Sequence, residues 1–298
     1  MSDGGDQRFE QAHHAASRLV AQGRSHVASA IERLGERIEA APPSTLVKRD
    51  IASARAGGHS LAFGQTLTHL YALNYGIESN LRALEVLMKH VPFYPVPATL
   101  LARAISEGAA TCAWLLDAKV NADQRAARGY ASLFRALEKS IAGARPEDAA
   151  TLVTIRDGLI SELETSRATI QRRTKDGKQS DDVSVVTVGS EYAKINFTIS
   201  QRVERELPKV GDLYASMSGV VHGEPTWLET ARAEPGLKAR LIGAVVCWSV
   251  EAWSRAAHAW VGVECGPIFN VGDLKRLRES IPPERVELFE SERHKRAE

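Results

Sequence analysis

The sequence predicts an all-α protein, a multi-helix bundle of seven to nine helices. Nearly every long segment repeats its apolar residues about every 3.6 positions, which is the spacing along one face of an α-helix. Prolines and glycines separate these segments, for example at Pro42-Pro43 and at Gly57-Gly58. Because proline cannot continue a helix, such breaks mark where one predicted helix ends and the next begins.

The first part of the chain contains the clearest helices. A helix over residues 9–41 ends at the two prolines, and a short helix over 50–55 follows. Pro97 suits the first turn of a helix over 97–118. Between them, the segment 67–88 carries the strongest apolar stripe. Its members are Leu67, Leu70, Tyr71, Tyr75, Ile77, Leu81, Leu84, Leu87 and Met88.

Two further helices are expected in the middle of the chain. Asn121 and Gln124 form a capping pair for a helix that extends to about Ile141. Pro146 starts the next helix, with acidic residues in its first turn, and this helix is expected to continue to Arg173.

The segment after this helix has the weakest helical pattern. Residues 174–182 are polar and contain glycine, so they are the best candidate for a flexible break. Residues 183–199 are rich in β-branched residues and could form a short hairpin. Because an isolated two-stranded hairpin is barely stable, we expect this segment to be irregular or helical.

The C-terminal part contains helices over 200–222, with an interruption near Pro208, and over 235–263. Two short helices, separated by Pro282-Pro283, are expected near the end of the chain. The predicted division is an N-terminal helical extension (1–60), a main helical bundle (61–265), and short C-terminal helices with a tail (266–298).

Composition indicates an ordinary globular protein in the cytoplasm. The 38 basic and 37 acidic residues give a net charge of +1, so any nucleic-acid-binding surface must be local. No signal sequence is visible, and the apolar run 241–253 is too short to span a membrane. The three cysteines are scattered, and no Cys/His spacing suggests a metal site. No cofactor-binding motif is present.

One chemical pattern is distinctive. In the stretch "YASMSGVVHGEP", Tyr214, Ser218 and His222 follow one another at intervals of four residues. On a helix these side chains share one face, spanning roughly 12 Å, and Gly223 after His222 suggests a helix end. At a helix C-terminus the dipole favours a charged imidazolium, which could take part in a site. Alternatively, the histidine only satisfies the free carbonyls of the last turn.

This stretch resembles the last motif of HEPN domains, which are helical bundles. Active members carry an arginine, a polar residue, three further residues and a histidine. The matching positions here begin at Met217, followed by Ser218, and end at His222. The resemblance implies an HEPN-like core and metal-independent RNA cleavage, usually across a dimer. Met217 stands where the arginine is expected, and a thioether cannot neutralise phosphate charge.

A second resemblance covers roughly residues 97–225. A group of uncharacterised actinobacterial proteins carries an "Arg-x-x-x-Glu … Trp-Leu-Leu-Asp" helix before a "Tyr-x-x-x-Ser-x-x-x-His-Gly" helix. The matching residues here include Arg103, Glu107 and Trp114. This likeness implies no established activity.

Charged residues on neighbouring segments could complete a site. Arg103 and Glu107 are one turn apart, with Trp114 further along the same side, and they could form a polar pocket with His222. Arg125 and Arg128 could face an anionic ligand. The alternative is that Arg103 and Glu107 hold two helices together while Arg125 and Arg128 are solvated.

Two hypotheses follow. The chain is an HEPN-like protein that engages RNA or a nucleotide, in toxin–antitoxin or phage-defence biology. His222, Arg103 and Glu107 would then be its catalytic candidates, and its ligand would be bound by Tyr214, Ser218, Arg125, Arg128 and Trp114. Alternatively, it is a non-enzymatic interaction module or homodimeric scaffold, in which the stripe is a buried polar network. A homo-oligomer is expected, with no membrane partner.

Overall fold

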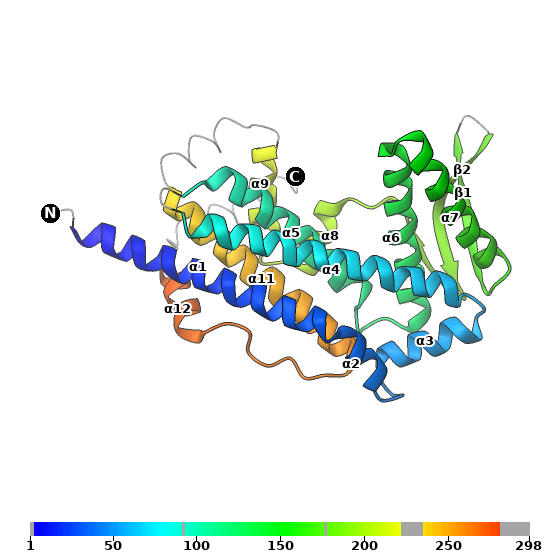
Figure 1. Cartoon of the computed structure of the whole chain (residues 1–298), viewed down its shortest axis with the longest axis horizontal. Coiled ribbons are helices and arrows are strands. Elements are labelled where there is room, and N and C mark those ends of the chain that lie inside the picture. Colours follow the sequence, from blue (N-terminus) through cyan, green and yellow to red (C-terminus); the bar gives the residue numbers. More distant parts are fainter. Residues whose placement is uncertain (1–2, 91–92, 176–177, 222–234, 281–298) are drawn as a thin grey trace, which may run out of the picture.

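The computed structural model describes residues 3–90, 93–175, 178–221 and 235–280 (Figure 1). These residues form eleven helices and one three-stranded sheet, so the predicted helical bundle is confirmed, whereas the predicted count of seven to nine helices without a sheet is not. The helices are α1 (Asp3–Glu32), α2 (Leu34–Ala40), α3 (Leu46–Ala56), α4 (Ser60–Met88), α5 (Pro95–Leu115), α6 (Ala122–Gly143), α7 (Pro146–Glu164), α8 (Ile199–Glu206), α9 (Gly211–Val221), α11 (Pro235–Val261) and α12 (Val271–Glu279). The strands are β1 (Ala168–Lys175), β2 (Lys178–Val188) and β3 (Glu191–Lys194).

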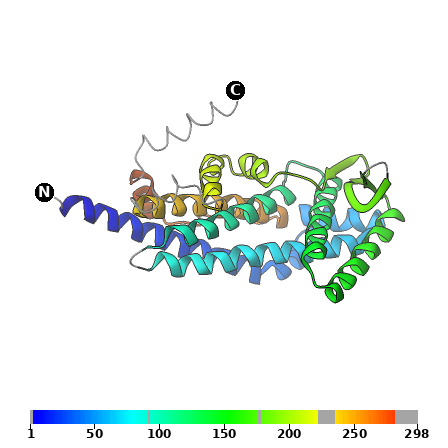
Figure 2. The same cartoon turned by 90° about the horizontal axis from the view of Figure 1, so that it is seen from above.

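The long helices α1, α4, α5 and α11 form the main bundle. They run side by side along the long axis of the molecule (Figures 1 and 2), with α5 packed on α4 and α11, and α1 packed on the same two helices. Their apolar faces form one core, to which Leu19, Ile77, Leu81, Ile105 and Trp253 each contribute a buried side chain.

Small residues allow the closest helix contacts in this bundle. A Cβ added to Gly108 of α5 would lie 2.8 Å from Ile77 Cγ1 of α4. A Cβ added to Gly243 of α11 would lie 2.8 Å from the Ala16 Cβ of α1. These separations are shorter than ordinary van der Waals contact, so both helix pairs require glycine at these positions.

A second unit lies at one end of the bundle (Figure 1). Helices α6 and α7 pack against an antiparallel sheet of order β1-β2-β3. Ala168 of β1 pairs with Val188 of β2, and the same valine pairs with Glu191 of β3. A separate core fills this unit, with Tyr130, Phe134, Leu163, Val186 and Ile195 among its buried members.

The sheet corrects two predictions. The helix expected to extend to Arg173 ends at Glu164, and strand β1 follows it. Residues 174–182 and most of 183–199, expected as a loop and an irregular or helical segment, belong largely to the strands. The physical reason is tertiary: Val183, Val186 and Val188 bury their side chains against the second core, which a lone hairpin lacks.

Several predicted boundaries are confirmed. Asn121 caps α6, because its Oδ1 accepts a 2.8 Å hydrogen bond from the backbone N–H of Gln124. The break near Pro208 separates α8 from α9, and α2 ends just before Pro42. The short helix expected after Pro282-Pro283 lies outside the described residues.

The apolar stripe of α4 is narrower than expected. Leu70, Ile77 and Leu81 are buried, whereas Tyr71 and Tyr75 are exposed. Tyr71 comes one residue after the buried Leu70, and Tyr75 comes two residues before the buried Ile77. Residues one or two positions apart point in different directions on a helix, so both tyrosines face away from the core.

The apolar run 241–253 lies within α11, where Val245 and Trp253 are buried in the bundle core. Among the helices of the described residues, none contains an apolar stretch long enough to cross a membrane.

Candidate functional site

The structure brings together three of the predicted site residues between α5 and α9. The Tyr214 hydroxyl donates a 2.6 Å hydrogen bond to Glu107 Oε1, and Arg103 Nε donates a 2.9 Å hydrogen bond to the same oxygen. The Arg103 guanidinium also lies 5.2 Å from the centroid of the Tyr214 ring. The Nη1 atom of Arg103 is buried and has no hydrogen-bond partner among the described residues.

The protonation state of Tyr214 follows from its surroundings. Burial, and then the hydrogen bond to Glu107, raise the pKa of Tyr214 to about 12. The phenol therefore keeps its proton at neutral pH and acts as a donor, which fixes the orientation of the Glu107 carboxylate.

The other members of the Tyr214 stripe have different positions. Ser218 is half-buried on α9. Met217, at the position where the HEPN resemblance expects an arginine, is buried in the main core. His222 lies outside the described residues, so its place near Arg103 and Glu107 stays a prediction.

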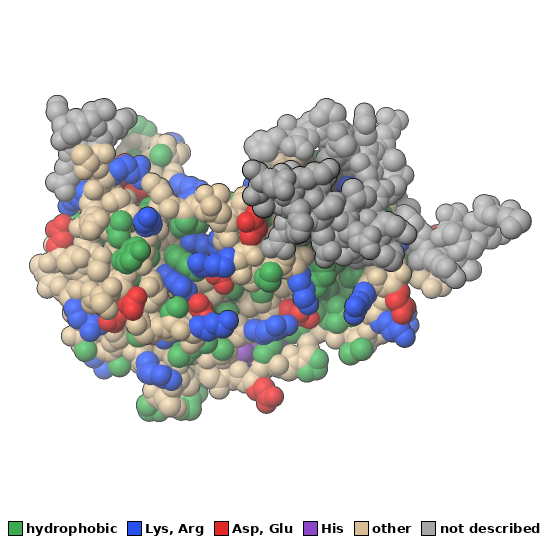
Figure 3. Space-filling view, turned by 180° about the vertical axis from the view of Figure 1, so that it is seen from behind, with side chains coloured by type: hydrophobic (Ala, Val, Ile, Leu, Met, Phe, Trp, Pro, Cys, Tyr) green, Lys and Arg blue, Asp and Glu red, His purple; other side chains and the backbone are tan. Residues whose placement is uncertain are grey.

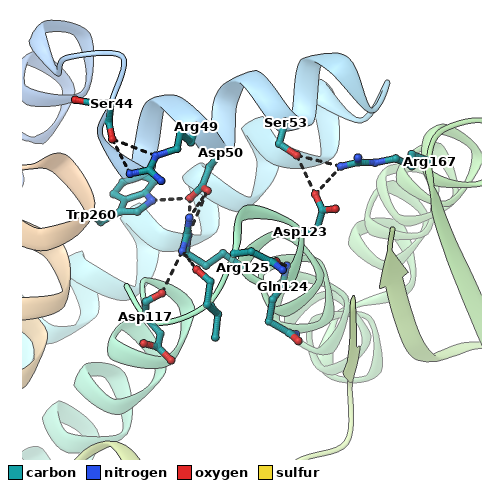
Figure 4. Close-up of polar contacts among 12 residues, drawn as sticks. Ser44, Arg49, Asp50, Ser53, Asp117, Asp123, Gln124, Arg125, Arg167 and Trp260 are labelled. Carbon is teal, nitrogen blue, oxygen red and sulfur yellow. Dashed lines mark hydrogen bonds and ion pairs between the residues drawn. The ribbon is translucent and has the colours of Figure 1, made fainter. Parts of the chain in front are cut away.

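Arg125 is part of a buried network and is not exposed to a ligand (Figure 4). Its Nη2 lies 2.7 Å from Asp50 Oδ1, in an ion pair whose two side chains are 5% and 4% exposed. Trp260 Nε1 donates a 2.8 Å hydrogen bond to the other oxygen of Asp50. Neither expectation for Arg125, a solvated side chain or one that faces an anionic ligand, agrees with this position. It joins α6 to α3 and α11 instead.

Arg128 and Trp114 contact each other beside a cleft. Arg128 Nη1 donates a 2.7 Å hydrogen bond to the backbone carbonyl of Trp114 and lies 3.3 Å from Asp117 Oδ2. The Arg128 side chain is only 12% exposed, so the alternative expectation that it is solvated is wrong.

Three residues that the sequence analysis missed extend this contact into a stack of arginines and aromatic rings. The Arg202 guanidinium lies 3.8 Å from the ring centroid of Trp114 and 3.2 Å from that of Phe197. Arg135 lies 3.9 Å from the Phe197 centroid. Cations thus alternate with rings, in the order Arg135, Phe197, Arg202, Trp114 and Arg128.

Two hollows adjoin this stack, and Phe197 lines both. The first, which we call the basic lobe, has a volume of about 510 Å³ and lies between α8, the start of α6 and the end of β3. Its cationic lining residues are Arg128, Lys194, Arg202 and Arg205, and its lining contains no carboxylate. Figure 3 shows the face with α8 and α9, where Lys and Arg side chains gather across the middle of the molecule.

The second hollow, which we call the apolar lobe, has a volume of about 390 Å³ and lies between α4, α5 and α6. Alanine, leucine, isoleucine and glycine residues form half of its wall, together with Phe197. Its polar lining residues are His69, Asn80, Glu107, Thr111, Ser132, Arg135 and Lys139. Glu107 therefore connects the Tyr214 cluster to this lobe.

The charge of Arg202 is unusual for a buried group. Arg202 is 5% exposed, and its guanidinium forms no ion pair with a carboxylate among the described residues. Burial, together with repulsion from Arg135 and Arg205, lowers the pKa of Arg202 to about 9. Burial also lowers the pKa of Arg128 and of Arg135. A buried cation without a counter-ion destabilises the fold, and a bound anion would relieve that cost.

A faint sequence signal for Arg202 did exist. On the helix Ile199–Glu206, Arg202 shares a face with Ile199 and Val203, so an arginine stands at an inward position. Phe197 gave no signal, because it lies in the segment that was expected to be irregular or helical.

Comparison of the chain with protein families, curated proteins and solved structures found no match. Within the described residues, no group of three or more His, Cys, Asp and Glu side chains is arranged to hold a metal ion.

Proposed function

We propose that this chain is an HEPN-like helical protein that binds single-stranded RNA or a free nucleotide in the cleft formed by the basic and apolar lobes. The observation that carries the proposal is Arg202, a buried arginine without a carboxylate partner among the described residues, held between two aromatic rings. A phosphate group is the anion common to both ligands.

The stack prepares its arginines for phosphate. Among the described residues Arg202 donates only a 3.5 Å hydrogen bond to Thr111 Oγ1, so its other N–H groups can bind phosphate oxygens. Lys194 adds charge in the same lobe, and so does Arg205, although its Nη2 lies 2.7 Å from Glu206 Oε1. This local surplus of cations supplies the binding surface that the nearly neutral chain as a whole does not.

The apolar lobe favours a nucleotide over a simple anion. Its volume of about 390 Å³ falls within the range of about 300–1,000 Å³ that is typical of small-molecule sites. A wall of apolar residues interspersed with polar groups suits a base, while the adjoining cations suit its phosphate. Single strands fit better than duplexes, because only an unpaired base can enter such a hollow.

Binding without cleavage is the version of this function that we propose. In active HEPN proteins the arginine before the histidine neutralises phosphate charge, and here Met217 occupies that position and is buried in the core. RNA incubated with the protein without metal should therefore stay intact, for the wild type and for His222→Ala alike. Cleavage that depends on His222 would replace this proposal with a catalytic one.

The test is titration of fluorescently labelled single-stranded RNA, followed by anisotropy. Arg205→Gln changes a side chain that is 61% exposed and should weaken binding. If one phosphate contact is lost, the slope of the logarithm of the binding constant against the logarithm of the salt concentration should become shallower by about 0.7. Arg145→Gln, an exposed change at the residue just before α7, is the matched control and should leave binding unchanged.

Competition separates the two ligand sources. Displacement of the labelled RNA by a mononucleotide at comparable concentration identifies a nucleotide site, whereas displacement by RNA alone identifies an RNA site. Absence of binding at low salt, or equal binding by wild type and Arg205→Gln, would overturn the proposal.

The second candidate is a non-enzymatic interaction module or homodimeric scaffold. The contact that favours it is the hydrogen bond from Tyr214 to Glu107, which fixes α9 against α5 as a structural network would. In that case the variants above would change stability without changing any affinity for RNA.

A further inference from the structure

The geometry points to an orientation and a base preference for the ligand. Resting on the proposed function, we infer that phosphate occupies the basic lobe while the apolar lobe receives a base with an exocyclic amino group, which donates a hydrogen bond to Glu107. Adenine, cytosine and guanine carry such a group, and uracil does not.

The two lobes differ in the charged residues that line them. The basic lobe is lined by four cations and by no carboxylate. The apolar lobe contains the Glu107 carboxylate in its wall, about one third exposed. A carboxylate repels phosphate and attracts hydrogen-bond donors, so the two parts of a nucleotide are directed to different lobes.

The two cations of the apolar lobe, Arg135 and Lys139, do not neutralise Glu107, which agrees with phosphate binding in the basic lobe and the base in the apolar lobe. Arg135 stacks on Phe197, the residue shared by both lobes, and donates to the Phe197 carbonyl, so it lies at the border. Lys139 is exposed. Neither forms an ion pair with Glu107 among the described residues, which leaves this carboxylate unneutralised from the α6 side.

The Glu107 carboxylate is preorganised. Tyr214 and Arg103 both donate to Oε1, and this fixes the carboxylate plane. Within the described part of the chain, Oε2 accepts no hydrogen bond. Glu107 therefore presents a fixed, available acceptor at the wall of the lobe, and Tyr214 and Arg103 act as positioning residues.

The bases differ in the donors that they offer to this carboxylate. A carboxylate oxygen accepts well from the amino group of cytosine N4 or adenine N6. Uracil has no exocyclic amino group; its one donor on this edge, N3–H, stands between two carbonyl oxygens that the carboxylate repels. When a bound base covers Glu107 without donating to Oε2, this oxygen loses its contact with water and gains no hydrogen bond. That loss disfavours uracil relative to a base with an amino group.

The experiment compares labelled homopolymers of about ten nucleotides, a length within the usual site size for single strands. The wild type is expected to bind oligo(A) and oligo(C) at least about fivefold more tightly than oligo(U). In Glu107→Gln this preference should fall to within about twofold, while binding of oligo(U) is kept or strengthened, because a negative charge beside the cleft is lost.

Two controls separate recognition from folding. Glu147→Gln, at an exposed position of α7, should keep the preference of the wild type. Tyr214→Phe keeps the ring but removes one donor to Oε1, so it should weaken the preference without abolishing RNA binding. Thermal melting of each variant verifies that it is folded.

The outcomes are distinguishable. Preference in the wild type that is lost in Glu107→Gln supports the inference. Equal binding of all homopolymers by the wild type, or a preference that Glu107→Gln retains, overturns the inference and leaves the proposed function standing. No binding of any homopolymer overturns both.

Discussion

The Arg202 guanidinium lies 3.2 Å from the centroid of the Phe197 ring; Arg202 lines the basic lobe, and Phe197 lines both lobes. The ring stabilises the cation but does not neutralise it, and repulsion from Arg135 and Arg205 opposes the charge. Burying this charge lowers the stability of the ligand-free protein, and a bound anion would neutralise the charge and restore that stability. Such an arrangement is the kind of compromise between stability and activity that marks functional sites.

The first prediction concerns this cost. Arg202→Met keeps an unbranched side chain between the two rings and removes the buried charge. We expect the free energy of unfolding of the ligand-free protein to rise by about 1 kcal/mol, measured by urea unfolding. The same variant should lose affinity for RNA. A loss of about 2 kcal/mol or more would show that the guanidinium stabilises the fold.

The second prediction concerns the buried ion pair of Arg125 and Asp50 (Figure 4). Asp50→Asn should lower the free energy of unfolding by about 3–5 kcal/mol, because it leaves Arg125 buried without its counter-ion. Urea unfolding measures the loss. Asp148→Asn, which breaks an exposed pair with Arg145, is the control and should change little. Equal effects of the two changes would contradict the structural role of Arg125.

The third prediction concerns pH. Burial lowers the pKa of four histidines below the ordinary value of 6.5, and for His26 the neighbouring His258 and Arg37 add to the effect. The histidines are His26, His59, His69 and His258. Each therefore takes up a proton less readily in the folded chain than in the unfolded chain as the pH falls through 6.5. Stability is therefore fully present well above pH 6.5 and falls as the pH drops through that value.

Urea unfolding between about pH 7.5 and 5.5 measures this dependence, with a slope of up to about 1.4 kcal/mol per pH unit for each histidine that stays neutral when folded. His26→Gln removes one of the four groups and should flatten the dependence. Stability that is constant or rises as the pH is lowered over this range would contradict the prediction.

The fourth prediction concerns Tyr214. Tyr214→Phe removes the 2.6 Å hydrogen bond to Glu107 and should lower the free energy of unfolding by about 1 kcal/mol. Tyr192→Phe, at a tyrosine that is 60% exposed, is the matched control and should have no measurable effect. Identical unfolding curves for the two variants would show that the Tyr214 hydroxyl contributes nothing to the packing of α9.

Local patterns predicted the helical part of this fold well. The capping pair at Asn121, the break at Pro208 and the long apolar helix α11 all involve interactions within a few residues, which sequence spacing reports directly. The strands β1 and β2 were missed because their stability depends on burial against α6 and α7, which no local pattern reveals.

The candidate site likewise contains residues that the sequence predicted and residues that only the folded structure brings together. Arg103, Glu107 and Tyr214 were identified because each lies at a regular helical spacing from a neighbour of the same motif. Arg125 was placed in the site from sequence, yet its partner Asp50 is 75 residues away, so its burial was not predictable. Arg135, Phe197 and Arg202 come from three distant segments and become a stack only in the folded chain.

By itself, the sequence determined that most of the chain is helical and that helices break near Pro42 and Pro208, because these features depend on contacts only three or four positions apart. The tertiary structure alone decided that a sheet covers α6, that Arg125 is structural, and that Arg202 stands between Trp114 and Phe197 with its charge uncompensated among the described residues. The physical reason is that the cost of a buried charge depends on which distant groups surround it, and only folding assembles them.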